Sequence, residues 1–242
     1  MTEKKRLPRG ASMPTLSVIP SNSEGVSQRV KAYQGFTQHI LSGGIRSGQF
    51  ISQRELTVLL GMPLGAVREM IPRLEAGGLV KTIPKRGLQI THVDLKLIRN
   101  AFQVREMIER EAILRFTHSA SDEELDVIEV SHRDMLRRAS SGKIDNDLLD
   151  DTQALDWGVH DRMVDALGNE IISEIYRVNS LRLRLIRLDL SVINTTNLVR
   201  SMEEHLRFIL ALKQRDGTSA MEHLSRHIRN SRDRVINAPS EP

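Results

Sequence analysis

The sequence has no cysteine among its 242 residues, which excludes disulfide bonds and zinc sites built from thiolates. Aromatic residues make up only 3% of the chain, so leucine, isoleucine, valine and methionine must supply the core. No apolar run approaches the roughly 18 residues of a transmembrane helix, and no secretion signal follows the basic N-terminus. We therefore expect a cytoplasmic protein with no membrane partner.

Charge is unevenly distributed along the chain. Residues 1–95 carry 13 Lys and Arg against 6 Asp and Glu, whereas the remainder carries 22 basic and 25 acidic residues. A basic first part joined to a mildly acidic second part indicates that the first part binds a polyanion. Residues 1–25 are rich in Lys, Arg, Pro and Ser without hydrophobic periodicity, so we expect a disordered basic tail.

Residues 26–93 begin with a helical pattern and continue with two short helices. Apolar residues recur at helical spacing from Val26 to Leu41. Ser52 and Glu55 have the spacing of a capping box, so the next helix should start at Ser52 and finish near Gly61. The order predicts a helix followed by the first half of a helix-turn-helix motif.

A second short helix and a hairpin complete this unit. Pro63 fits the first turn of a helix that runs to Gly77 and Gly78. The β-branched runs LVKTI and LQIT flank the basic turn PKRG, which is typical of a β-hairpin. The sequence therefore predicts a winged helix-turn-helix domain over residues 26–93, whose second short helix enters the DNA major groove.

The residues expected to face DNA are polar or small and fall on one predicted surface: Arg54, Gly65, Arg68, Lys85, Arg86 and Gly87. Their cationic side chains can neutralise phosphates or donate to guanine. Each arginine taken alone is as well explained by ordinary solvation. Their joint placement favours contact with double-stranded DNA.

The stretches ILSGGIRSGQFISQREL and GAVREMIPRLEAGGLVKTIPKRGLQIT resemble the GntR family of transcriptional regulators, over roughly residues 26–92. The family's recognition helix usually begins with Ser, Arg, Thr and Pro, where this chain has Pro63, Leu64, Gly65 and Ala66. This departure bears on the operator sequence and not on DNA binding as such. Because one winged helix buries little surface on DNA, we expect a homodimer on a palindromic operator.

Residues 94–237 carry helical patterns throughout. The predicted helices cover about Leu95–Thr117, Ser121 to Ser140, Asp145–Leu167, a segment from Glu170 onward, Thr196–Arg215 and Thr218–Val235. Six helices in this length favour an antiparallel all-α bundle, and the fold class is expected to be mainly α.

Four residues from three of these helices are candidate metal ligands. Asp156 and His160 are four residues apart and share a helix face, while His205 and His227 lie among apolar residues expected to face the interior. Three imidazoles and one carboxylate suit a divalent transition metal such as zinc, nickel or manganese. His223 competes with His227, and a metal-free bundle in which the histidines bond to one another is the alternative.

The pieces VREMIERE, DWGVHDRMVDALGN, EEHLRFILALKQRD and AMEHLSRH resemble the FCD effector domain of a large GntR subfamily, over residues 96–235. The resemblance implies that Asp156, His160, His205 and His227 are the metal ligands, because the spacing from Ala220 favours His227 over His223.

The resemblance also implies that a small organic acid binds at this metal as effector. Arg105 occupies the position of an arginine that could clamp the carboxylate, although a salt bridge to Glu109 explains it equally well. Asn179 and Arg182 fall on the predicted inner face of their helix and are further candidates.

These observations predict a dimeric, ligand-responsive transcriptional regulator, with repression as the expected mode. A metal-dependent hydrolase or lyase that uses the Asp and His site is the alternative. The sequence lacks an HExxH motif and an obvious general base, and an enzyme would leave the basic first part unexplained.

Overall fold

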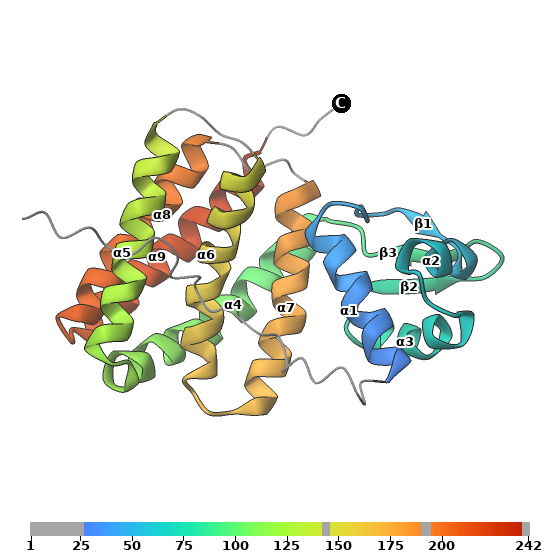
Figure 1. The fold of residues 1–242 in the computed structure, drawn as a ribbon, viewed down its shortest axis with the longest axis horizontal. Coiled ribbons are helices and arrows are strands. Elements are labelled where there is room, and N and C mark those ends of the chain that lie inside the picture. Colours follow the sequence, from blue (N-terminus) through green and yellow to red (C-terminus); the bar gives the residue numbers. More distant parts are fainter. Residues whose placement is uncertain (1–26, 142–145, 190–194, 239–242) are drawn as a thin grey trace, which may run out of the picture.

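The computed structural model describes residues 27–141, 146–189 and 195–238, and it is mainly α-helical as expected (Figure 1). The expected basic tail, residues 1–25, lies outside the described residues. The first elements are α1 (Gln28–Leu41), β1 (Phe50–Ile51), α2 (Gln53–Leu60), α3 (Leu64–Ala76), β2 (Val80–Ile83) and β3 (Gly87–Ile90). The rest are α4 (Leu95–Ser119), α5 (Asp122–Ser140), α6 (Asn146–Asp165), α7 (Glu170–Asp189), α8 (Thr195–Lys213) and α9 (Gly217–Ile236). None of the described helices combines the length and apolar character needed to cross a bilayer.

Helix α2 is capped at both ends, whereas α3 begins after Pro63 without a side-chain cap. The Ser52 hydroxyl accepts from the Glu55 N–H at 3.1 Å and the Glu55 carboxylate accepts from the Ser52 N–H at 2.7 Å, which confirms the predicted capping box. Gly61 ends α2 in the left-handed conformation, with φ of 60°. Pro63 precedes the first turn of α3 instead of lying in it, because its extended ψ of 150° turns its carbonyl toward the Val67 N–H.

Three strands form an antiparallel sheet in the order β1-β3-β2. The predicted hairpin is present, with Val80 opposite Ile90 and Ile83 opposite Gly87. Strand β1 pairs with the other edge of β3 and was not predicted, because a strand of two residues is too short to show alternation. Buried leucine, isoleucine and valine side chains of this sheet and of α1–α3 belong to one continuous core with the later helices.

Helices α4–α9 pack on one another and agree with the predicted helices to within a few residues. Ser121 caps α5 as predicted, since its hydroxyl accepts from the Glu124 N–H at 3.1 Å. Helix α7 lies against α4 and α6 on one side and against α1 on the other (Figure 1). It therefore stands between the first group of elements, α1 to β3, and the other helices of the second group, α4–α9.

Helix α7 also contacts the end of α3. The Arg182 guanidinium donates to the carbonyl oxygen of Gly77, the residue that follows α3. Arg73 of α3 pairs with Glu174 of α7 at 3.5 Å. One helix therefore touches both the interior of the later bundle and the C-terminal end of α3.

The hairpin tip generates a prediction about stability. Gly87 has φ of 92°, and a Cβ there would lie 2.9 Å from the Ile51 carbonyl oxygen, so we expect Gly87→Ala to destabilise the fold by roughly 1–3 kcal/mol. Gly65→Ala is the matched control, since a Cβ at that helical position meets nothing within 4 Å. Urea unfolding should separate the two variants, and equal midpoints would contradict the prediction.

Candidate metal centre

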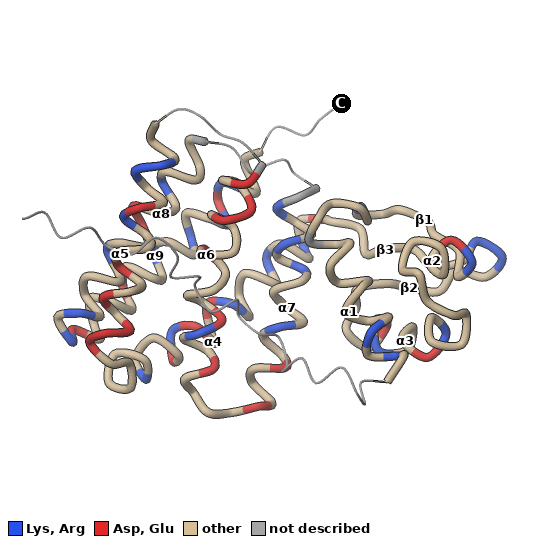
Figure 2. Tube along the Cα trace, viewed as in Figure 1, with Lys and Arg blue, Asp and Glu red and all other residues tan. Residues whose placement is uncertain are grey.

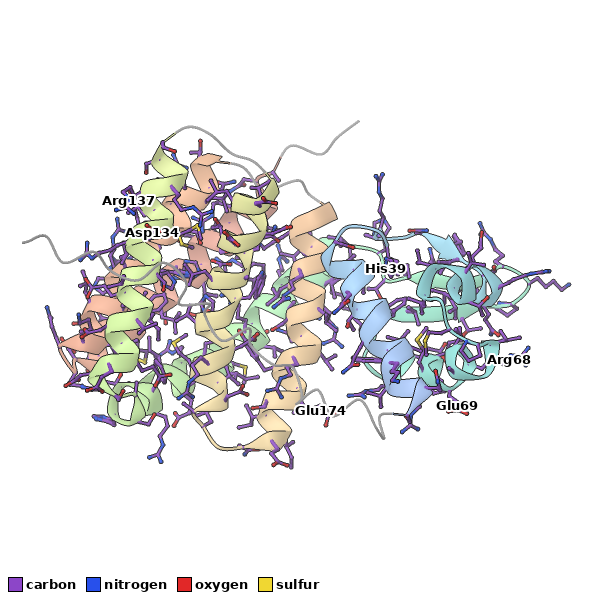
Figure 3. All side chains as sticks on the ribbon, viewed as in Figure 1. His39, Arg68, Glu69, Asp134, Arg137 and Glu174 are labelled. Carbon is purple, nitrogen blue, oxygen red and sulfur yellow. The ribbon has the colours of Figure 1, made fainter. Side chains whose placement is uncertain are left out.

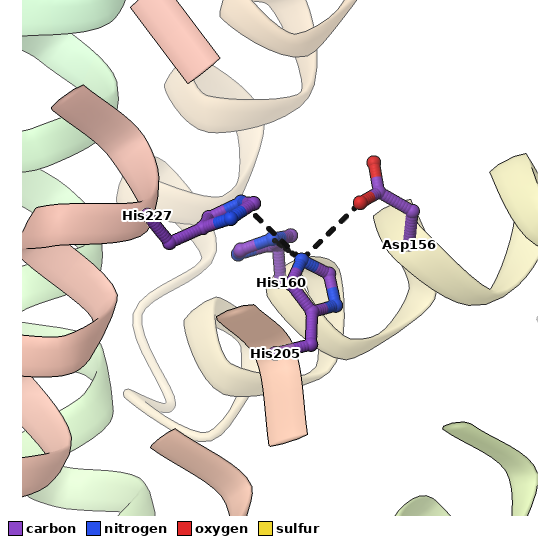
Figure 4. Close-up of side chains that lie close together, drawn as sticks. All are labelled: Asp156, His160, His205 and His227. Atoms are coloured by element: carbon purple, nitrogen blue, oxygen red, sulfur yellow. Dashed lines mark hydrogen bonds and ion pairs between the residues drawn. The ribbon is translucent and has the colours of Figure 1, made fainter. Parts of the chain in front are cut away.

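Three helices bring four buried side chains to one point (Figure 4). The i,i+4 spacing on α6 places Asp156 and His160 on the same face, and His205 of α8 and His227 of α9 face them. One ligand atom from each of the four lies within 4.8 Å of all the others. The group contains His227 and not its competitor His223.

The ring nitrogens that meet at this point are the Nε2 atoms. His205 Nε2 lies 3.3 Å from His160 Nε2, 3.2 Å from His227 Nε2 and 3.2 Å from Asp156 Oδ1. Two ligands that are each bound at roughly 2.0–2.1 Å to one tetrahedral ion lie about 3.3 Å apart. The three distances from His205 therefore match donors around a common centre, and no two of the four ligand atoms are more than 4.8 Å apart.

The outer nitrogens of two rings face carboxylates. Glu204 Oε2 lies 2.8 Å from His227 Nδ1, and Glu109 Oε2 lies 2.8 Å from His160 Nδ1 although away from the ideal hydrogen-bond direction. A carboxylate at this position favours the tautomer that carries its proton on Nδ1. The Nε2 atoms of His160 and His227 are then unprotonated, and each carries a lone pair.

The tautomer of the third ring is fixed through another histidine. The Ile128 carbonyl can only accept, so His132 Nδ1, 2.7 Å away, must donate to it. His132 Nε2 is then an acceptor, and His205 Nδ1 donates to it at 3.2 Å. His205 Nε2 therefore also presents a lone pair to the common centre.

The four converging donor atoms suit a bound cation better than a metal-free bundle interior. Three imidazole lone pairs and a carboxylate oxygen that converge in a buried space repel one another unless a positive charge lies between them. Burial lowers the pKa of His205 to about 3 and that of His227 to about 4, so both rings are neutral near pH 7. Burial likewise lowers the pKa of His132 to about 3. Neutral imidazoles are the form that binds divalent transition metals.

The carboxylates of the centre remain charged although they are buried. Burial opposes the ionisation of Asp156, but Arg187, whose Nη1 donates to Oδ2 at 2.7 Å, holds the pKa of Asp156 well below its usual range. The Ser201 hydroxyl donates to the other oxygen at 2.9 Å. For Glu109, burial is likewise outweighed, chiefly by the Arg105 guanidinium, and the pKa is lowered to about 2.

The three residues predicted to bind an effector occupy different places. Arg105 is 1% exposed beside the centre, and its Nε donates to Glu109 at 2.7 Å, so the salt bridge alternative is confirmed. Its Nη2 nonetheless has no partner among the described residues. The Asn179 amide is buried and donates to the Ala101 carbonyl at 2.9 Å. Arg182 is not brought to the centre, because it binds the Gly77 carbonyl near α3.

Sequence reasoning missed four contributors to the centre: His132, Arg187, Ser201 and Glu204. Each one is defined by a neighbour on another helix, and no motif spacing in one sequence identifies such a pair. Glu204 precedes His205 directly, yet it contacts the ring of His227 on α9.

The residues predicted to face DNA lie at the surface of the first group of elements. Arg54, Gly65, Arg68, Lys85 and Arg86 are exposed, and Gly87 is half-buried. The Arg86 guanidinium lies 4.0 Å from the centre of the Phe50 ring, and the Arg68 Nε donates to Gln53 at 3.1 Å. These residues lie on α2, on α3, in the turn between β2 and β3, and, for Gly87, at the start of β3.

Comparison with known proteins shows that residues 100–230 match the FCD domain family. Two curated relatives are similar over most of their length. The HTH-type transcriptional regulator YdhC of Bacillus subtilis is 24% identical over 199 residues, which cover 81% of this chain and 85% of YdhC. The Nta operon transcriptional regulator of Aminobacter aminovorans is 25% identical over 192 residues, which cover 79% of this chain and 86% of the relative.

Solved structures share the fold. McbR/YncC of E. coli superposes with a TM-score of 0.75 at 16% identity, and the match covers 87% of this chain and 98% of that protein. A structure described as a GntR transcriptional regulator from Rhodococcus sp. RHA1 gives a TM-score of 0.69 at 15% identity, with 88% and 99% of the two chains covered.

The histidine chain generates a test of the centre. His132→Leu removes the acceptor that fixes the His205 tautomer, so we expect about 10- to 100-fold weaker binding of zinc in a chelator competition titration. His118→Leu, which changes an exposed histidine of α4, should bind zinc as the unaltered protein does. An unchanged affinity in His132→Leu, with the fold intact by circular dichroism, would contradict the assignment.

Proposed function

The chain belongs to the FCD domain family of GntR regulators, and from this premise we propose that it is a metal-containing, ligand-responsive regulator that binds DNA as a homodimer. The proposal that the protein senses an effector at a metal rests on the convergence of four buried ligand atoms within 4.8 Å. The curated relatives are named as transcriptional regulators, which favours regulation over the enzyme alternative.

In this proposal residues 26–93 form a winged helix-turn-helix domain, and residues 94–237 form the effector-binding domain. The order α1, α2, α3 and the β2–β3 hairpin supports the first assignment. Figure 2 shows basic residues at the turn between β2 and β3 and on α3, where a winged helix contacts the DNA backbone. Leu64, 40% exposed at the start of α3, replaces a polar residue and so changes base recognition.

The centre would hold one zinc, nickel or manganese ion through Asp156, His160, His205 and His227. A bound divalent ion supplies a Lewis-acidic docking point for a carboxylate. Arg105 provides the second contact to that carboxylate, which its partner-free Nη2 supports. A small organic acid is therefore the proposed effector.

Effector binding reaches the DNA-binding domain through helix α7. This helix carries Arg187, which binds the Asp156 carboxylate, and Arg182, which binds the carbonyl at the end of α3. A ligand that favours one position of α7 shifts the populations of the two positions and so alters the placement of α3.

DNA binding can be tested with an operator selected from random duplexes, which should be two-fold symmetric. Binding should weaken steeply as salt rises, and Arg68→Ala should lower both the affinity and the salt slope, the slope by about 1 per lost phosphate contact. Arg137→Ala is the control, because this arginine lies on α5 at the other end of the molecule (Figure 3). Salt-independent affinity, or failure to prefer any duplex over random DNA, would refute the proposal.

Metal binding can be tested by elemental analysis of protein purified without chelators. We expect about one equivalent of a divalent transition metal, which His227→Ala loses because a ligand is removed. His223→Ala should retain the metal, since His223 stands outside the ligand group. If His223→Ala lost the metal and His227→Ala retained it, His223 and not His227 would be the ligand.

A further inference from the structure

Three guanidinium groups surround the buried indole of Trp157, which directly follows Asp156. Arg105 of α4 lies 5.3 Å from the ring centre, and Arg184 and Arg187 of α7 lie 4.8 Å and 5.4 Å from it. An indole face attracts each guanidinium only modestly, while like charges gathered around one ring repel one another. Stacking alone therefore does not account for the cluster.

The acidic partners of these arginines leave hydrogen-bond donors free. The pairs are Arg105 with Glu109 at 2.7 Å, Arg187 with Asp156 at 2.7 Å and Arg184 with Asp161 at 3.8 Å. The last distance is too long for a direct hydrogen bond. Within the part of the chain that the structure covers, Arg184 Nε and Arg105 Nη2 are buried and have no hydrogen-bond partner, and Asp161 Oδ1, on the carboxylate that faces Arg184, has none either. The gap of 3.8 Å between Arg184 and Asp161 is thus unbridged, and an acceptor on a ligand would satisfy the two buried donors.

The formal charges around the ring indicate how many negative charges the acceptor carries. The three guanidinium groups are matched in number by three carboxylates, and the nearby Glu204 is matched by Arg234. A divalent cation at the Asp156 and histidine centre would then leave two positive charges without compensation. One carboxylate on a ligand neutralises half of this surplus, whereas two anionic groups neutralise all of it.

We propose that the effector is a small acid with two anionic groups, one held at the metal centre with Arg105 and the other held by Arg184 beside Trp157. This inference rests on the proposed function and makes it more specific. Arg184 is the residue that selects two charges over one, since its side chain is 22% exposed and its Nε is partner-free. Arg187 is already engaged by Asp156 and positions that carboxylate.

The inference can be tested by calorimetry on the full-length protein loaded with zinc. Malonate, succinate, glutarate and phosphoglycolate are each compared with the monomethyl ester of their carboxyl group, which removes one charge and keeps the carbon skeleton. At least one diacid should bind about tenfold or more tightly than its ester, because a charged hydrogen bond is lost with the ester. Phosphoglycolate distinguishes a phosphorylated acid from a dicarboxylate.

Variants of α7 assign the second charge to Arg184. In Arg184→Gln the diacid affinity should fall to that of the ester while the ester affinity changes little, and Arg184→Lys should recover part of the difference. Arg177→Gln is the control two turns earlier on the same helix, where the side chain is 57% exposed and pairs with Asp165. Circular dichroism and zinc content should be unchanged in all three variants.

Each outcome decides between the two claims. Equal binding of diacid and ester, or equal weakening of both by Arg184→Gln, overturns the inference, whereas the proposed function stands if the bound acid still changes operator affinity. Binding of no acid at all overturns the inference and the sensing half of the proposed function together. Operator binding by the protein without added acid is measured separately and tests the DNA-binding half.

Discussion

The convergence of unshared electron pairs in the bundle interior is the constraint on which the arrangement of α4, α5, α6, α8 and α9 depends. Each imidazole presents its inner nitrogen only because another helix holds the outer one: α4 supplies Glu109, α5 supplies His132 and α8 supplies Glu204. A ring that lost its partner could turn its lone pair away or take a proton at the centre. These contacts from the outer nitrogens link α4, α5, α6, α8 and α9 to one another around the centre.

Helix α7 stands apart from this set because it contributes none of the four converging ligand atoms. Its contacts are instead with the surroundings: Arg187 reaches the Asp156 carboxylate, Tyr176 donates to Glu109 at 2.6 Å, and Arg182 reaches the end of α3. Helix α7 therefore contacts both the carboxylate of the centre and the end of α3, and in the proposed function it is the element that couples them.

The parts of this structure that the sequence predicts are those with local signals. The capping box of Ser52 and Glu55, the hairpin around Lys85 and the helix face shared by Asp156 and His160 each follow from spacing along one segment. The outer contacts do not follow from any such spacing, because they join residues on different helices whose rotation depends on packing. Arg182 shows the limit: its helix face was inferred from periodicity, yet its partner lies 105 residues away.

The strength of the coupling that α7 can transmit follows from the contacts at its ends. A tenfold change in operator affinity requires about 1.4 kcal/mol of difference between two states. A hydrogen bond from a guanidinium to a carbonyl contributes about 1.5–3 kcal/mol, and the half-buried Arg182 belongs near the lower limit of that range because solvent screens it. The exposed pair of Arg73 and Glu174 adds little. In the proposed function, a difference between the two states in the hydrogen bond from Arg182 to the end of α3 would supply about a tenfold response, and a larger response would require α1, which also packs on α7, to move with it.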